Sequence, residues 1–153
     1  MGKPAFISII ATTAVLAAVL PAMGAGADFR AHAARTLNAT DTARLHFVHS
    51  SGSKLFEEGS ATGAIPGTMS AHFDIGPTVS TTFVLRARGG GTLIGHGSGT
   101  LHGSGRYESF AGTIVVSSGT GRYLHAHGHA GLYGTFDRRT YALVVQTTGD
   151  LSY

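Results

Sequence analysis

The chain of 153 residues contains no cysteine and no tryptophan, and only 12% of its residues are charged. Without thiols, neither a disulfide framework nor a thiolate metal site can form, so the fold must depend on packing and backbone hydrogen bonds. Lysine occurs only as Lys3 and Lys54, and the arginines are scattered along the sequence. Because no concentrated basic patch is present to follow a phosphate backbone, we expect no nucleic-acid partner.

The first 27 residues have the pattern of a cleavable secretion signal. Lys3 supplies a short positive start, the stretch from Phe6 to Leu20 is apolar, and Pro21 ends it. The small residues from Ala25 to Ala27 fit the cleavage site of such a signal. A retained membrane anchor is the alternative, but a span needs about 20 apolar residues. We therefore expect a secreted or extracytoplasmic protein without a membrane span after cleavage.

Cleavage would leave 126 of the 153 residues, with 10 basic and 8 acidic side chains once Lys3 is removed. A chain of this length forms one domain and buries roughly two thirds of the surface that it exposes when unfolded. The small net charge predicts no binding to an anionic membrane.

The remaining chain has the pattern of an antiparallel β protein. Short runs of Val, Ile, Thr, Tyr and Phe are separated by clusters of Gly, Pro, Ser and Asp, and no helical periodicity is present. We expect eight strands with short connections, which close naturally into an up-and-down barrel without free edges. A two-sheet sandwich is the alternative. The expected strands are Thr42 to His49, Phe56 to Ile65, Thr68 to Ile75, Ser80 to Arg88, Thr92 to His102, Tyr107 to Val116, Tyr123 to Phe136 and Thr140 to Leu151. This predicts an irregular leader over residues 28–41 and a barrel domain over residues 42–153.

The segment TIVVSSGTGRYLHAHGHA, from Thr113 to Ala130, resembles a late hairpin of the dirigent and allene oxide cyclase-like barrel families. The segment departs from the family pattern at Ser118, where a further glycine is usual. The matching residues are Val115, Val116, Gly119, Thr120, Gly121, Tyr123, Ala126, Gly128 and Ala130. The resemblance implies an eight-stranded barrel, and it covers less than a fifth of the chain.

The plant members of these families steer radical coupling or cyclise an unsaturated epoxide in an apolar cavity, and dirigent-like proteins form trimers. The resemblance therefore implies an apolar ligand and a homo-oligomer for this chain. The family uses a few acidic, arginine or asparagine residues of the earlier strands, but no motif here places them, so the catalytic residues stay unassigned. Residues of the right type in that part of the chain are Glu57, Glu58, Asp74, Arg86 and Arg88.

Histidines occur at alternate positions in YLHAHGHAGLY, from Tyr123 to Tyr133. On a strand, His125, His127 and His129 would share one face with both tyrosines, opposite a face of Leu, Ala and Gly. Alternate residues lie about 6.6 to 6.8 Å apart along a strand, so at most one adjacent pair could join a metal site. The weak metal candidates are His125, His127, His96 and His102. No fixed spacing completes a site, and we expect neither a metal nor another cofactor.

Which of these faces points into the barrel decides the role of the histidines. If the polar face points inward, the histidines could line a cavity and exchange protons near neutral pH. We favour the apolar face inside, because a small barrel needs a dry core unless it holds a ligand. Glu57 and Glu58 should face opposite sides of their strand, with one of them paired to Arg86 or Arg88.

Three functions fit these patterns. The leading hypothesis is a barrel that binds a small apolar or amphiphilic molecule in a cavity of several hundred cubic ångströms. The residues expected to line this cavity are Phe73, Phe83, Phe110 and Tyr141. The second hypothesis is a cofactor-free isomerase or cyclase, which requires a buried acid or base such as Glu58, Asp74 or a histidine. The third is a structural or interaction protein of the cell envelope without a pocket.

Overall fold

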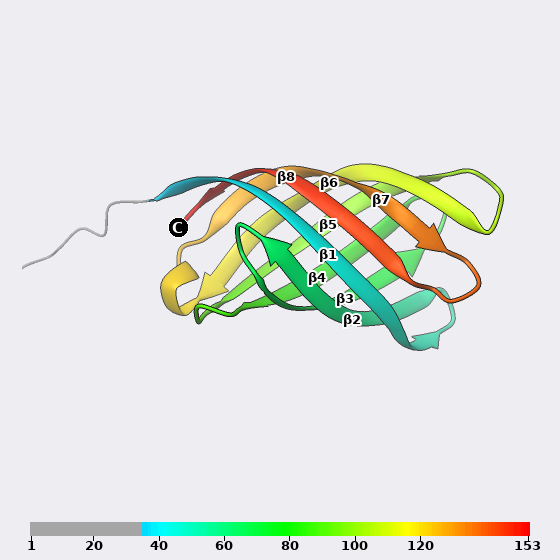
Figure 1. Ribbon diagram of the computed structural model, residues 1–153, viewed down its shortest axis with the longest axis horizontal. Coiled ribbons are helices and arrows are strands. Elements are labelled where there is room, and N and C mark those ends of the chain that lie inside the picture. Colours follow the sequence, from blue (N-terminus) through cyan, green and yellow to red (C-terminus); the bar gives the residue numbers. More distant parts are fainter. Residues whose placement is uncertain (1–34) are drawn as a thin grey trace, which may run out of the picture. The chain divides into compact units, whose positions relative to one another are not determined.

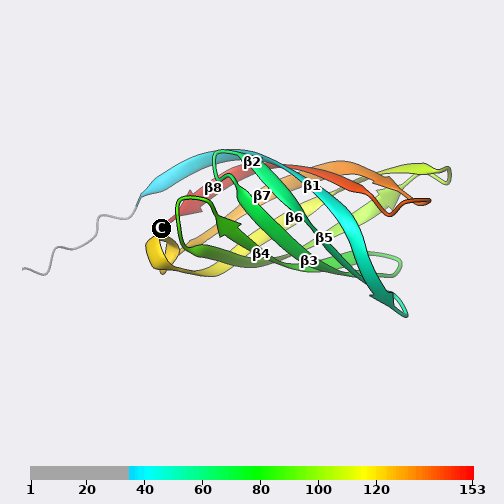
Figure 2. The same ribbon diagram turned by 60° about the horizontal axis from the view of Figure 1, so that its bottom comes forward.

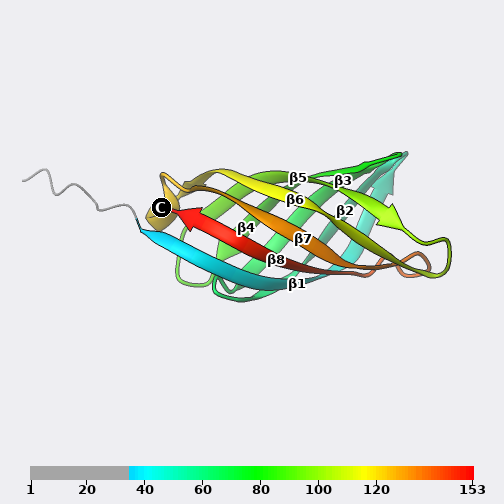
Figure 3. The ribbon, with the colours of Figure 1, turned by 90° about the horizontal axis from the view of Figure 1, so that it is seen from above.

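A computed structural model describes residues 35–153 as a closed barrel of eight antiparallel strands, with each strand paired to its neighbours in sequence. Strand β1 pairs with β8 and completes the closure, and Figures 1 and 3 show these two strands side by side. The elements are β1 (Thr36–Ser51), β2 (Lys54–Gly63), β3 (Gly67–Ile75), β4 (Val79–Ala87), β5 (Thr92–His102), β6 (Tyr107–Thr120), the 3-10 helix η1 (Gly121–Tyr123), β7 (His127–Asp137) and β8 (Leu143–Ser152). The barrel was the expected fold, and the sandwich alternative is excluded.

The strand boundaries differ from the sequence expectation at several places, since β6 extends to Thr120 and β8 begins only at Leu143. Strand β1 begins at Thr36, so the second half of the expected leader over residues 28–41 belongs to the barrel. Strand β7 begins only at His127, because the chain first forms η1 after β6. The expected signal segment, residues 1–27, lies outside the described residues. Within residues 35–153, no helix has the length and hydropathy needed to cross a membrane.

The alternation of side chains along each strand produces the apolar core of the barrel. In β5, Leu93, Gly95 and Gly97 are buried toward the interior, whereas His96 and Ser98 are exposed on the outer surface. Because this alternation repeats around the barrel, one apolar core forms along its axis. The strands run obliquely to the long axis of the barrel, as Figures 1 and 2 show.

The two ends of the barrel differ. At the plug end, which carries η1 and the start of β1, Tyr123 is only 4% exposed and its ring packs against Tyr153 with 4.9 Å between centroids. The guanidinium of Arg122 lies over both rings, 5.2 Å from Tyr123 and 5.9 Å from Tyr153. Gly121 starts η1 with a φ of +59°, which glycine adopts without strain. The segment with the family resemblance therefore builds the closure of this end.

The opposite end, called the mouth end below, carries the β1–β2, β3–β4, β5–β6 and β7–β8 turns. Apolar side chains there are incompletely covered: Phe47 is 36% exposed and Tyr141 is 41% exposed. Two ion pairs hold the turns at this end, one between Arg106 and Asp137 and one between Arg138 and Glu108. The mouth end is thus the end at which apolar surface reaches solvent.

Candidate functional site

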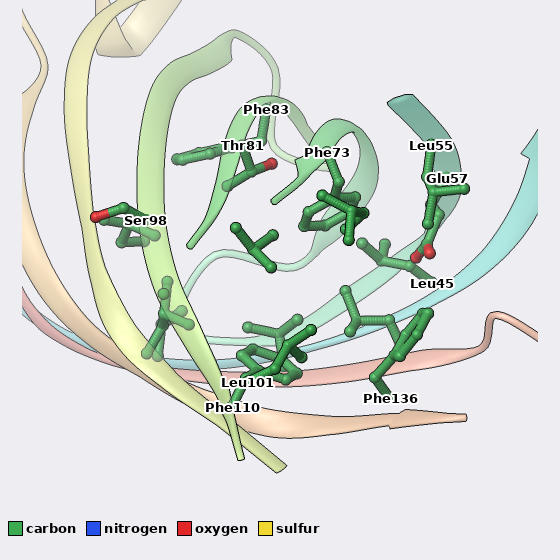
Figure 4. A pocket seen from close by; sticks show the side chains of 18 of the residues that line it. Leu45, Leu55, Glu57, Phe73, Thr81, Phe83, Ser98, Leu101, Phe110 and Phe136 are labelled. Carbon is green, nitrogen blue, oxygen red and sulfur yellow. The ribbon is translucent and has the colours of Figure 1, made fainter. Parts of the chain in front are cut away.

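A cavity of about 80 Å³ lies inside the barrel toward the mouth end, and Figure 4 shows the side chains around it. Nearly all of its lining is apolar, and it includes Phe73, Phe83 and Phe110 as the sequence predicted. The cavity is smaller than the several hundred cubic ångströms expected, because Leu and Phe side chains from β1 to β8 fill most of the interior. Its size suits a short hydrocarbon group rather than a drug-sized molecule.

Tyr141 does not line this cavity, contrary to expectation. It lies in the β7–β8 turn with a φ of +59°, rather than on a strand that begins at Thr140. Its ring packs against Phe47 at 5.2 Å and Phe136 at 6.0 Å between centroids. Tyr141 therefore belongs to the rim of the mouth end, where it covers Phe136, which does line the cavity.

A second interior cavity, of about 90 Å³, lies nearer the plug end. Five residues line both cavities and lie between them: Met69, Phe83, Ile114, Val145 and Thr147. Asp41 lines the second cavity and accepts a hydrogen bond from the backbone N–H of Ile65 at 2.8 Å. Burial raises the pKa of Asp41, against the lowering effect of its backbone hydrogen bonds.

Glu57 is the one ionisable residue among those that line the cavity at the mouth end. Strand β2 places it opposite Phe47 of β1 and Ala71 of β3, with its side chain pointing inward. It is 1% exposed, and its Oε2 atom is buried with no hydrogen-bond partner among the described residues. Burial raises the pKa of Glu57 to about 7. Figure 4 shows its carboxyl group among apolar side chains.

The sequence correctly placed Glu57 and Glu58 on opposite faces, since Glu58 is exposed. The expected partner is absent, however, because no ion pair joins Glu57 to Arg86 or Arg88 in residues 35–153. Sequence reasoning named Glu58, Asp74 or a histidine as the buried acid or base. One feature of the sequence could have identified Glu57 as the buried acid. It lies two residues after Leu55, so both side chains share the buried face of the strand.

The other buried acidic groups of the mouth end are paired with arginines. Glu108 is 1% exposed and forms an ion pair with Arg138 at 2.6 Å, although neither of its carboxyl oxygens has a partner in full hydrogen-bond geometry. Asp137 accepts hydrogen bonds from Arg106 and from the backbone N–H of Arg139, and these interactions hold its pKa well below the usual range. Neither carboxylate lines a cavity. Glu57 therefore differs from both, because it faces a cavity without a cationic partner.

The histidines of the expected polar face point outward. His127 and His129 of β7 are exposed, and so are His96 and His102 of β5. His125 lies in the loop before β7, where its backbone oxygen contacts Nδ1 of His127 at 3.0 Å. Tyr123 does not share their face, since it is buried in the plug. The part of the chain that the structure describes contains no group of three His, Asp or Glu residues arranged to hold a metal ion.

A wider hollow of about 560 Å³ lies along β3 to β6, and most of its lining residues are polar and exposed. The strand register places Thr82 between His72 and His96 on this surface. Unlike the interior cavity, the hollow contains no buried ionisable group. The interior cavity with Glu57 is therefore the better candidate for a specific site.

Comparisons with known proteins give no relative. No protein-family model, no curated protein and no solved structure matches this chain.

Proposed function

We propose that this protein binds a small apolar or amphiphilic molecule inside the mouth end of its barrel. The observation that carries this proposal is an apolar cavity that contains one buried, unpartnered carboxyl group, that of Glu57. A barrel that served only as a scaffold would gain stability from an apolar residue at this position, since a buried polar group without a partner costs free energy.

The partly exposed apolar side chains of the mouth end support an entry route there. Ile75 and Val79 flank the β3–β4 turn and also line the cavity, and both are only partly buried. Phe47 and Tyr141 form an aromatic contact at the same end of the barrel. A hydrocarbon group could enter by rotation of such side chains, without breaking any strand pairing.

The proposal is tested by titrating the full-length protein with hexanol and following backbone amide signals by NMR. Saturable shifts should be confined to the strands around the cavity. Thr81→Phe should abolish them, because Thr81 points inward and lines the cavity. Thr82→Phe is the matched control, since Thr82 is exposed on the outer surface and does not line this cavity. Equal binding by wild type and Thr81→Phe would exclude the interior as the site.

Two features support a relation to the dirigent and allene oxide cyclase-like barrels, and we include this relation in the proposal. The first is the eight-stranded closed barrel, and the second is the Thr113 to Ala130 segment, which forms the end of β6, η1 and the start of β7.

Secretion is proposed on the pattern of residues 1–27 alone. The third hypothesis, an envelope protein without a pocket, has less support because Glu57 has no role in it.

A cofactor-free isomerase or cyclase is the second candidate function, and the environment of Glu57 favours it. A carboxyl group with a pKa of about 7 can both accept and donate a proton at neutral pH. The test is exchange of the α-protons of hexan-2-one in deuterium oxide, followed by NMR. Wild type should exchange them faster than Glu57→Gln, whereas Glu58→Gln should behave as wild type. Equal rates in all three proteins would exclude proton transfer by Glu57 to this class of substrate.

A further inference from the structure

The charges inside the barrel are of one sign. Among the described residues that line the two interior cavities, the buried or half-buried ionisable groups are the carboxyls of Glu57 and Asp41, and neither lysine nor arginine is present. His129 and Asp150 also border the cavity near the plug end, but both residues are exposed on the outer surface. Arg106 and Arg138, the arginines that pair with acidic groups near the mouth, are roughly half exposed and do not line a cavity. An anionic molecule would therefore meet no positive partner inside.

The geometry points to a ligand class, and we propose that the cavity at the mouth end binds a small apolar amine, with its ammonium group held by the carboxylate of Glu57. This inference rests on the proposed ligand-binding function. The cavity supplies an apolar wall for the hydrocarbon part and one acceptor for the polar part. An ammonium group has three donors and no acceptor, so it matches a carboxylate that lacks a partner.

The folded protein has already removed Glu57 from water, so ligand binding does not add that cost again. A buried ion pair is usually opposed by the desolvation of both charges. Here the carboxyl of Glu57 is 1% exposed before any ligand arrives, and only the ammonium group loses its hydration on binding. Such preorganisation leaves more of the interaction to appear as affinity.

The same arrangement selects against carboxylic acids. A bound carboxylate would place a second negative charge near Glu57 in an apolar cavity, so one of the two groups would have to take up a proton. Neutral alcohols avoid this repulsion. Their hydroxyl group can donate a hydrogen bond to Glu57, but it brings no positive charge to the carboxylate. The order of affinity should therefore be amine, alcohol and then carboxylate for equal chain lengths.

Amine binding should depend on the protonation of Glu57. The neighbours that face Glu57 are uncharged, since β1 and β3 place Phe47 and Ala71 opposite it, and β4 to β8 contribute no ionisable group to the cavity wall. Glu108 of β6 also points inward near this end, but it is paired with Arg138 of the β7–β8 turn. Alkylammonium groups titrate near the range of lysine and stay charged below pH 9. Affinity for the amine should thus rise as the pH passes through about 7, where Glu57 ionises.

The test compares hexylamine, hexanol and hexanoate by calorimetry and NMR at pH 5.5 and pH 8. At pH 8 hexylamine should bind about 10- to 100-fold more tightly than hexanol, because both partners are charged in the ammonium–carboxylate hydrogen bond and only one is charged when the alcohol binds. Glu57→Gln should remove most of this difference and leave hexanol binding little changed. Glu58→Gln, an identical change at an exposed neighbour, should keep it.

The outcomes separate this inference from the proposed function. Saturable hexanol or hexanoate binding with no preference for hexylamine would overturn the inference while the ligand-binding function stands. Absence of binding by all three molecules would overturn both. If Glu57→Gln fails to fold, the affinity of the wild-type protein for hexylamine at pH 5.5 and pH 8 tests the inference instead. An affinity that does not rise between these two pH values also overturns the inference.

Discussion

The ring of Phe83 on β4 lies over Gly95 on β5, its direct partner in the strand register. A Cβ atom on Gly95 would come within 2.6 Å of Cζ of Phe83, so the glycine makes the space that the ring occupies. Phe110 and Gly134 repeat this relationship between β6 and β7, again with 2.6 Å between Cζ and the added carbon. Two aromatic residues of the cavity wall are thus placed by glycines on neighbouring strands.

Gly95→Ala should destabilise the barrel because the added methyl group would overlap both the ring of Phe83 and the backbone oxygen of Val115. Overpacking of this kind typically costs about 1 to 3 kcal/mol, and the ring could relieve it only by moving into the cavity. Urea denaturation at pH 7 measures the change. Gly105→Ala is the control, since a Cβ there meets no atom within 4 Å. Equal stability of the two variants would show that Gly95 is not needed for ring placement.

Glu57 should make the protein less stable as the pH rises. Burial raises its pKa to about 7 in the folded state from the ordinary glutamate value of 4.5, so the folded protein holds this proton more tightly than the unfolded chain. The stabilising contribution is present below pH 4.5 and is lost as the pH rises through 7. The loss is on the order of 3 kcal/mol, because each pKa unit corresponds to about 1.4 kcal/mol.

Glu57→Gln should remove this dependence, since glutamine has nearly the same shape and does not ionise. Denaturation curves at pH 5 and pH 8.5 should show similar stability for wild type and variant at the lower pH and a more stable variant at the higher pH. Glu58→Gln serves as the control because that side chain is exposed. Parallel pH profiles for wild type and Glu57→Gln would mean that Glu57 is not a buried acid in solution.

Asp137 should have the opposite pH dependence. Its contacts with Arg106 and with the backbone N–H of Arg139 lower its pKa, so its contribution is present above the unfolded pKa of about 4 and is lost as the pH falls further. Asp137→Asn should lower Tm at pH 7 and have less effect below pH 3. Asp74→Asn removes an ion pair with Lys54 in which both side chains are well exposed, and should change Tm little. Similar losses in both variants would contradict this ranking.

The sequence predicted the barrel because strand alternation and glycine-rich turns are local signals. It also indicated the outward face of the histidines, since a small barrel needs apolar residues inside. Three features depended on contacts between distant residues and could not be predicted. Tyr123 turned inward because the chain forms η1 rather than extending β7. Tyr141 became a rim residue through its turn conformation. Glu57 lacked a partner because Arg86 points outward on a strand two positions away in the barrel.

The plug formed by Tyr123 should be a major source of stability. Its side chain is buried against Tyr153 and under the guanidinium of Arg122, and no other helical element covers this end within the described residues. Tyr123→Ala removes a large ring from a packed site, a change that typically costs about 3 to 5 kcal/mol. Urea denaturation should show this loss.

Tyr123→Phe separates the ring from its hydroxyl group and should stay within about 1 kcal/mol of wild type, since no hydrogen bond from the Tyr123 hydroxyl is present among residues 35–153. Leu124→Ala is a second control, because Leu124 is the next residue and is 61% exposed. If Tyr123→Ala were as stable as Leu124→Ala, the 3-10 helix would not close the barrel in solution.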